Sequence, residues 1–182
     1  MSNSAVHFQL LYNQYSALVY TTALHYVQNS EDAEEITQDV FVQVHQSIDQ
    51  FKNNASITTW IYRIAINKSL DFIKHKKSKK RFFIFGTKTD SKQALENATT
   101  FEHPGVLMEQ QENAKILFKV IEELTENQRT AFILSKIDGL SNPEIAQIMD
   151  TSISSVESLV FRAKSNLKEQ LSKKFEEYRK KK

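Results

Sequence analysis

The sequence has no cysteine, only three glycines and two prolines, and no apolar run long enough to cross a bilayer. The lack of cysteine excludes disulfide bonds and thiolate chemistry, and it fits a reducing compartment. So few glycines and prolines disfavour a strand-rich fold, which needs frequent turns. These absences predict an all-α protein of 182 residues.

Recognisable catalytic and cofactor motifs are also missing. The five histidines have no metal-ligand spacing, and neither G-x-x-x-x-G-K-[ST] nor G-x-G-x-x-G occurs. No carboxylate pair or Ser/His/Asp grouping stands out, so we expect no catalytic residue, no metal and no cofactor. The N-terminus lacks a charged segment followed by an apolar stretch, and we therefore expect a cytoplasmic protein without membrane insertion.

Charge is segregated along the chain, although the net charge is only +2. One short segment contains five acids and no base: Glu31, Asp32, Glu34, Glu35 and Asp39. Another contains six bases: Lys74, Lys76, Lys77, Lys79, Lys80 and Arg81. This separation predicts two kinds of partner.

Hydrophobic periodicity divides the chain into three parts. Helical spacing of apolar residues is found in the first and last parts, and a polar stretch with Gly86 and Pro104-Gly105 lies between them. We predict two small helical domains, 5–81 and 109–175, joined by a flexible linker over 82–108.

The last third carries the capping signals of a helix-turn-helix. A T-x-x-Q box at Thr125 and Gln128 and an S-x-x-E box at Ser141 and Glu144 mark two helix starts. Gly139 follows an apolar run, where a helix end favours a residue that tolerates positive φ. The expected helices span about 125–137, 142–149 and 153–171. The last two form a candidate DNA-reading unit.

The helix over 153–171 has two different sides. The side expected to be buried consists of Val156, Val160, Ala163, Leu167 and Leu171. The opposite side consists of Ser154, Ser155, Ser158, Phe161, Arg162 and Ser165. The serines alone would equally fit a solvated surface. Phe161, however, has no core to enter and needs a partner, and Arg162 can reach a phosphate or a guanine edge.

A helix expected over 31–49 is also two-sided. Its core side consists of Ala33, Ile36, Val40, Phe41, Val44 and Ile48. Its polar side surrounds Val42 with Glu35, Gln38, Asp39, Gln46 and Asp49. An apolar centre with a polar rim is typical of a protein-docking surface, although a solvated face with one stray valine has the same pattern.

The next expected helix, 58–77, combines an indole with cations. Its buried side consists of Ile61, Tyr62, Ala65, Ile66, Ser69, Phe72 and Ile73. Its other side consists of Trp60, Arg63, Ile64, Asn67, Asp71 and Lys74. A stacking platform beside a phosphate-binding ridge is used to bind single-stranded nucleic acid, and the preceding loop with Lys52, Asn53 and Asn54 is a candidate reader of an unstacked base. The alternative is a tryptophan folded under that loop.

These segments resemble the extracytoplasmic-function (ECF) sigma factors, the two-domain members of the sigma-70 family. Asp32 to Phe41, Thr59 to Asn67 and Asp71 are similar to the family's domain 2. Leu124 to Gln128, Asp138 to Ser141, Glu144 to Ala146 and Val156 to Ala163 are similar to its domain 4. The matches follow the family's order, with a linker between them.

The resemblance implies a transcription initiation factor, and it assigns a partner to each surface. It implies that the β′ clamp helices of core RNA polymerase bind Glu35, Gln38, Asp39 and Val42. It implies that unpaired bases of the minus-10 promoter element bind Lys52, Asn53, Asn54, Trp60, Arg63, Asn67 and Lys74. It implies that the minus-35 element binds Ser154, Ser155, Glu157, Ser158, Phe161 and Arg162. It further implies that domain 4 rests on the β flap and that an anti-sigma factor is a partner.

Four positions depart from the family's usual pattern. Glu157 stands where Lys or Arg is usual, and Leu159 replaces a frequent Arg. A carboxylate cannot hold a phosphate, but Glu157 can accept from the N4 amino group of cytosine, pair with Lys164 or stay solvated. Glu157 and Leu159 therefore leave the base preference of the minus-35 element open. Asn53-Asn54 replaces a more usual Gly-Asp, which leaves the preference of the minus-10 element open.

Two other functions compete with this interpretation. A helix-turn-helix repressor or activator that acts without core polymerase would explain the last third, but not an exposed tryptophan beside an Asn-rich loop. A helical scaffold whose acidic face binds a basic partner would have little salt-sensitive affinity for DNA.

Overall fold

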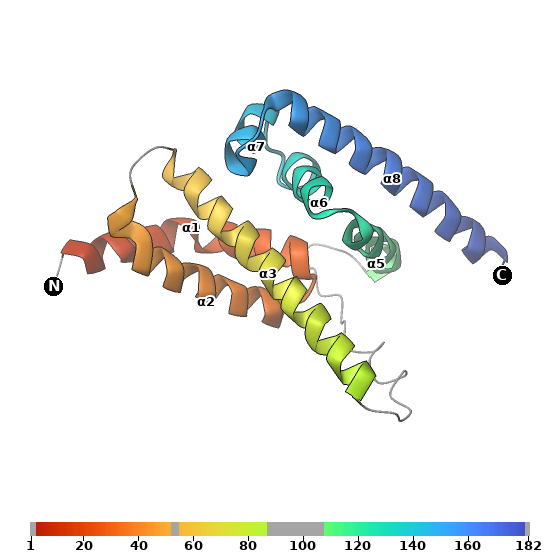
Figure 1. Cartoon of the computed structure of the whole chain (residues 1–182), viewed down its shortest axis with the longest axis horizontal. Coiled ribbons are helices and arrows are strands. Elements are labelled where there is room, and N and C mark those ends of the chain that lie inside the picture. The colour runs from red at the N-terminus through yellow and green to blue at the C-terminus, as the bar shows by residue number, and fades with distance from the viewer. Residues whose placement is uncertain (1–2, 52–54, 87–107, 181–182) are drawn as a thin grey trace. The chain divides into compact units, whose positions relative to one another are not determined.

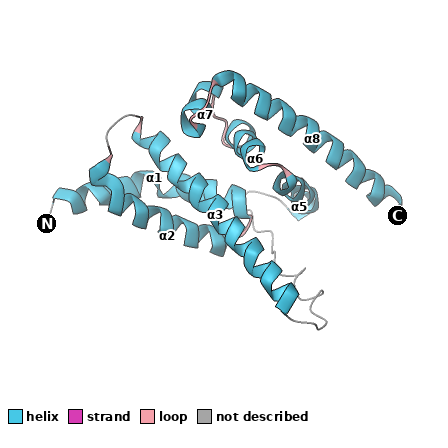
Figure 2. Cartoon of the chain, viewed as in Figure 1, coloured by secondary structure: helices cyan, strands magenta, loops and turns pink. Residues whose placement is uncertain are grey.

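The computed structural model describes residues 3–51, 55–86 and 108–180, and every regular element in these residues is a helix (Figures 1 and 2). The chain divides into two compact units, Met1–His103 and Pro104–Lys182. Each unit has its own apolar core. The predicted fold class, all-α with two helical domains, is confirmed.

Three helices form the first unit. Helices α1 (Asn3–Val27), α2 (Ser30–Ser47) and α3 (Ile57–Gly86) each pack against the other two, and the 3-10 turn η1 (Ile48–Gln50) follows α2. The fully buried centre consists of Val19, Ala23, Ala33, Val40, Val44, Ile61 and Ala65. These residues recur at spacings of four or seven along each helix, which places their side chains on one helix face.

Helix α3 is longer than the sequence predicts. It continues to Gly86 rather than ending near residue 77, so residues 82–86 of the expected linker are helical. The remainder of that linker up to residue 107 lies outside the described residues.

A short turn joins α1 to α2 and is closed by two side chains. Gln28 has a φ of 54°, and its side-chain amide donates to the carbonyl oxygens of Leu24 (3.1 Å) and His25 (2.8 Å). Those carbonyls belong to the last turn of α1, where helical N–H donors run out, and the carbonyl of Leu24 also accepts from the backbone N–H of Gln28 at 2.9 Å. Asn29 then caps α2 by accepting a hydrogen bond from the backbone N–H of Asp32 at 2.8 Å.

The second unit is built around its last helix. It contains α5 (Met108–Glu123), α6 (Glu126–Phe132), the π-helical turn η2 (Ile133–Ile137), α7 (Asn142–Met149) and α8 (Ile153–Lys180). Helix α8 packs against α5, α6 and α7. The helix predicted over 125–137 is therefore α-helical only to Phe132 and ends in one π-helical turn, while α8 runs past its predicted end at residue 171.

Of the two predicted capping boxes, only the second forms. The backbone N–H and the hydroxyl of Ser141 donate to Oε2 of Glu144 at 2.8 and 2.6 Å. Thr125 makes no side-chain cap. Gln128 instead accepts a hydrogen bond at 3.1 Å from the side-chain amide of Asn166 on α8, so a long-range contact replaces the predicted local one.

Gly139 ends the helical segment as predicted. Its φ is +73°, and the N–H of Leu140 donates to the carbonyl oxygen of Leu134 at 2.9 Å, a bond typical of helices that end at a glycine. A Cβ atom at Gly139 would meet nothing within 4 Å. The backbone conformation alone therefore favours glycine here.

We expect Gly139→Ala to lower the free energy of unfolding of the second unit by about 1 kcal/mol, because an L side chain disfavours a left-handed backbone. Gly139→Asn, the control, should cost less since asparagine tolerates this conformation. Urea unfolding followed by circular dichroism measures the change. Fluorescence of Trp60, the only tryptophan, reports on unfolding of the first unit, and the urea midpoint that it measures should not change. Equal stability of Gly139→Ala and the original chain would contradict the expectation.

Candidate nucleic-acid and protein interfaces

The α2 surface has the predicted apolar centre and polar rim. Val42 is 55% exposed, and Glu35, Gln38 and Asp39 around it are exposed as well. On the opposite side Ala33, Ile36, Val40, Phe41 and Val44 are buried. We call the exposed set of Glu35, Gln38, Asp39 and Val42 the α2 surface.

Aromatic contacts, which the sequence analysis did not predict, fix the last turns of α2 against α1. The ring of Phe41 lies 4.8 Å from that of Tyr12, and the ring of Phe8 lies 5.1 Å from that of His45. Both pairs meet edge to face, the arrangement that ring quadrupoles favour. The α2 surface is thus carried on a helix whose opposite side is firmly packed.

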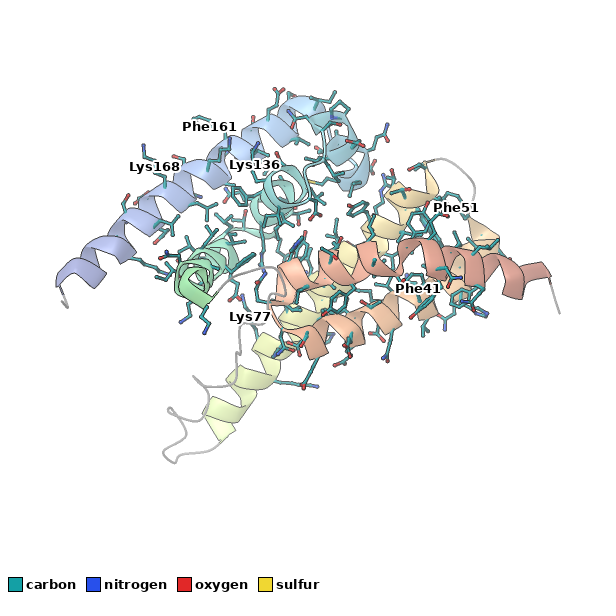
Figure 3. The ribbon with its side chains drawn as sticks, turned by 180° about the vertical axis from the view of Figure 1, so that it is seen from behind. Phe41, Phe51, Lys77, Lys136, Phe161 and Lys168 are labelled. Carbon is teal, nitrogen blue, oxygen red and sulfur yellow. The ribbon has the colours of Figure 1, made fainter. Side chains whose placement is uncertain are left out.

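Trp60 is less exposed than predicted. It is half-buried, and its ring lies 5.0 Å from that of Phe51. Phe51, which Figure 3 labels, is the last described residue before the loop. The sequence offered an exposed platform and a tryptophan under the loop as alternatives, and the structure lies between them. The indole packs on Phe51, and part of the residue is accessible to solvent. Lys52, Asn53 and Asn54 lie outside the described residues.

The start of α3, which positions Trp60, is held by hydroxyl groups. The hydroxyl of Ser56 accepts a hydrogen bond from the backbone N–H of Thr59 at 3.0 Å, which caps the helix. The hydroxyl groups of Tyr15 on α1 and Thr58 on α3 are 3.1 Å apart. These contacts fix the helix start against α1.

Four of the residues predicted on the outer side of α3 are at least partly exposed. Asn67, Asp71 and Lys74 are exposed and Arg63 is half-buried, while the Lys74 ammonium lies 4.0 Å from the Asp71 carboxylate. The assignment of Ile64 to this side was wrong, since Ile64 is only 7% exposed. It comes three residues after the fully buried Ile61, so it borders the core side of the helix.

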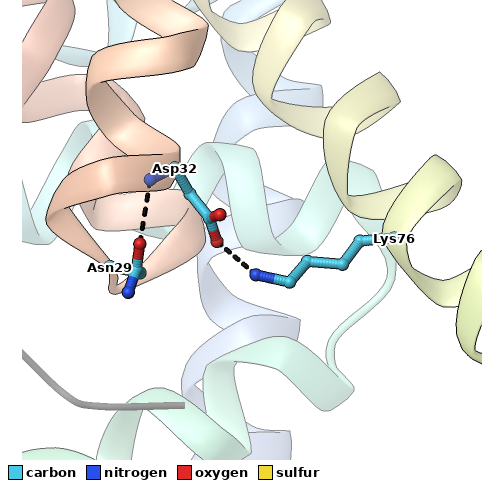
Figure 4. A network of polar contacts seen from close by, with 3 residues as sticks. All are labelled: Asn29, Asp32 and Lys76. Carbon is cyan, nitrogen blue, oxygen red and sulfur yellow. Dashed lines mark hydrogen bonds and ion pairs between the residues drawn. The ribbon is translucent and has the colours of Figure 1, made fainter. Parts of the chain in front are cut away.

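The acidic and basic segments are connected. Figure 4 shows Asp32, near the start of α2, donating its backbone N–H to the side-chain oxygen of Asn29 and pairing through its carboxylate with Lys76 of α3. Lys76 is 44 positions away in sequence, so the segregation of charge along the chain did not reveal this pair. An exposed ion pair adds little stability, but it removes Lys76 from the cations that are free to bind phosphate.

The turn between α7 and α8 is fixed at both ends. Asp150 ends α7 in a left-handed conformation with a φ of 51°. The Ser152 hydroxyl accepts from the backbone N–H of Ser155 at 3.2 Å at the start of α8.

At the start of α7, hydrogen bonds from the hydroxyl and the backbone N–H of Ser141 lower the pKa of Glu144 below its ordinary value. That cap stabilises α7 above the ordinary carboxyl pKa, and its contribution is lost as the pH falls through the lowered value.

Helix α8 separates its two sides as predicted. Val156, Val160, Ala163 and Leu167 are buried, and Leu171 is half-buried. On the other side Phe161 is 73% exposed and points away from the ribbon (Figure 3). The rest of that side, apart from the half-buried Ser155, is exposed: Ser154, Glu157, Ser158, Arg162 and Ser165. We call the set of Ser154, Ser155, Glu157, Ser158, Phe161 and Arg162 the α8 surface.

Known proteins share both the sequence and the helical arrangement. A family model described as Sigma-70 region 2 matches residues 11–79, and one described as Sigma-70, region 4, matches residues 114–167. The ECF RNA polymerase sigma-E factor of Escherichia coli is 33% identical over 161 residues, which are 86% of this chain and 82% of that protein. The chain is an ECF sigma factor of the sigma-70 family.

Further relatives agree with this assignment. The sigma-E factor of Haemophilus influenzae is 27% identical over 165 residues, covering 90% of this chain and 87% of the relative. Two solved structures share the fold at 22% identity and cover 91% of the chain. One is CnrH in complex with the cytosolic domain of CnrY (TM-score 0.60, 87% of that chain). The other is the sigma factor RpoE in complex with the anti-sigma factor NepR from Bartonella quintana (TM-score 0.64, 97% of that chain).

This ECF sigma factor therefore directs transcription initiation, as the sequence predicted. A helix-turn-helix regulator that works without polymerase is not favoured, because the region 2 match accounts for the first unit. Within the described residues, no group of His, Asp and Glu side chains could hold a metal ion. Nor is any described helix long and apolar enough to cross a membrane.

Proposed function

We propose that this ECF sigma factor binds core RNA polymerase and promoter DNA through three separate surfaces, and that an anti-sigma factor controls it in the cytoplasm. The observation that carries the proposal is the exposure, on packed helices, of surfaces suited to different partners. One is acidic with an apolar centre, one is aromatic and cationic, and one is a helix-turn-helix face.

The α2 surface is the proposed contact with the β′ clamp helices. Its carboxylates would meet a basic surface, and Val42 would be buried at the centre of the contact. Neither Asp39 nor Val42 has a structural role in the first unit, because both point away from its core. Domain 4 is proposed to rest on the β flap.

The start of α3 is the proposed contact with unpaired bases of the minus-10 element. A base can stack on the accessible part of the indole of Trp60, and Arg63, Asn67 and Lys74 lie on the same side of the helix for contacts to phosphates and base edges. Lys52, Asn53 and Asn54 of the preceding loop belong to the same proposed site.

The α8 surface is the proposed reader of the minus-35 element in the major groove. It follows a short helix and a tight turn, as a recognition helix does in a helix-turn-helix. Phe161 can contact a thymine methyl group, and Arg162 can reach a guanine edge or a phosphate.

An anti-sigma factor is a reasonable partner because both solved structures of similar fold were obtained as complexes. NepR is described as an anti-sigma factor bound to RpoE, and CnrY is bound to CnrH. A protein that covered the α2 surface or the α8 surface would compete with polymerase or DNA.

Run-off transcription tests the proposed function as a whole. We expect transcripts from genomic promoters only when core polymerase and this chain are both present. Trp60→Ala should reduce open-complex formation, since one base–aromatic stack contributes ~1–3 kcal/mol. Trp60→Phe, the matched control, should retain part of the activity. If the chain and core polymerase together open no promoter, the proposed function is wrong.

The α2 surface generates a second prediction. Asp39→Arg and Val42→Glu should each weaken binding to core polymerase at least tenfold, because one reverses a charge at the contact and the other buries a charge at its centre. Titration of a labelled chain with core polymerase measures the affinity. Glu122→Arg on α5 changes the net charge as Asp39→Arg does and should leave the affinity unaltered. Unchanged affinity of both α2 variants would remove this surface from the interface.

Arg162→Ala should weaken promoter binding by about 1–3 kcal/mol, the range for one good base contact. The loss should depend on the minus-35 sequence and disappear on a scrambled element. Lys168→Ala, which removes the same charge from an exposed position of α8, should act on all sequences alike. Gel-shift titrations of the polymerase complex that find no difference between the two variants would exclude Arg162 as a base reader.

A further inference from the structure

Glu157 is an unusual residue for the α8 surface because it carries negative charge toward a polyanion. It is exposed, and it lies three residues after Ser154 and four before Phe161, so these three residues share one side of the helix. A carboxylate in this position is repelled by phosphates and gains nothing from the backbone of DNA. This repulsion must be offset by hydrogen bonds from donors to the carboxylate.

The structure removes one of the alternatives for Glu157. In the part of the chain that is described, Glu157 forms no ion pair with a lysine or arginine, and Lys164 is not its partner. Its contact is with the neighbouring helix: the side-chain amide of Asn142, the first residue of α7, donates to Oε1 at 3.5 Å. At that length the hydrogen bond is weak. It can orient the carboxylate, but it does not neutralise it.

The position of Asn142 gives this contact a consequence. Asn142 belongs to α7, and the connection from α7 to α8 is fixed by the left-handed Asp150 and the Ser152 cap. The Glu157 side chain is therefore oriented by a weak contact from outside its own helix. Oε1 accepts from Asn142, and Oε2 is available to a donor on the DNA.

Only two groups in the major groove can donate to a carboxylate: N4 of cytosine and N6 of adenine. In adenine the acceptor N7 lies beside N6 and repels a carboxylate, whereas an amide suits both atoms. The neighbouring atom on cytosine is a ring carbon, so cytosine is the base that fits Glu157.

We propose that Glu157 is a specificity-determining residue that selects a cytosine in the minus-35 element through its N4 amino group, and that Asn142 positions its carboxylate. This inference rests on the proposed function, since it places the α8 surface in the major groove. It also gives the substitution of a carboxylate for a cation a physical consequence: fewer phosphate contacts and one added base preference.

The test is a selection of duplexes randomised over the minus-35 region, carried out with the full-length chain bound to core polymerase. The original chain should prefer cytosine at one position by roughly 5- to 100-fold, the range that one good base contact gives. Glu157→Gln should move the preference at that position to adenine, because an amide can bind N6 and N7 together. Glu157→Ala should abolish it without weakening binding to other sequences, and Asn142→Ala should reduce it.

Glu169→Gln is the matched control. Glu169 is an exposed carboxylate of the same helix, twelve positions after Glu157, and it is paired with Lys173. It should leave every preference unchanged. The inference is overturned if Glu157→Gln and Glu157→Ala keep the original preferences at all positions, or if the affected base is not cytosine. If the original chain selects no minus-35 sequence, the proposed function itself fails and the inference falls with it.

Discussion

Burial of one side of α8 is the constraint on which the orientation of the α8 surface depends. Val156 and Ala163 have no solvent exposure, and Val160 and Leu167 are nearly as buried. Rotating the helix would expose these side chains at a cost of roughly 1.5–3 kcal/mol for each large one. Because the buried side cannot move, the opposite side is fixed as well. Phe161 and Arg162 are thus oriented by residues in the core of the second unit.

The first unit applies the same constraint to two surfaces at once. Its core takes one side from each of three helices, which leaves the outer sides of α2 and α3 facing solvent, and these are the two surfaces of the proposed function. Local contacts then refine each surface. Phe51 holds part of the Trp60 ring, so under the proposed function a stacking base would meet an indole that is already ordered. An ordered platform loses less conformational entropy on binding than a freely rotating side chain does.

The sequence predicted what depends on local spacing and missed what depends on distant partners. Periodicity identified the buried sides of α2 and α8, and glycine chemistry identified the turn at Gly139, because each is decided within a few residues. The Asp32–Lys76 pair, the Asn166–Gln128 bond that replaced a capping box, and the packing of Trp60 on Phe51 require the tertiary fold. Ile64 was misassigned for a related reason, since a residue at the border between two helix sides is decided by its neighbours. The exposed sides of α2 and α8 were recognisable from the sequence, but the exposure of Trp60 and Ile64 was not.

Under the proposed function, charge explains why a sigma factor of this composition would depend on core polymerase. Non-specific affinity for DNA rises with the number of phosphates that a protein neutralises, and this chain has a net charge of only +2, with Lys76 engaged by Asp32. Glu157 subtracts further from the attraction at the surface that faces DNA in the proposed function. Weak affinity for DNA in general leaves base contacts to decide where the chain binds. Under that function, polymerase would supply the remaining binding free energy through a separate contact with α2.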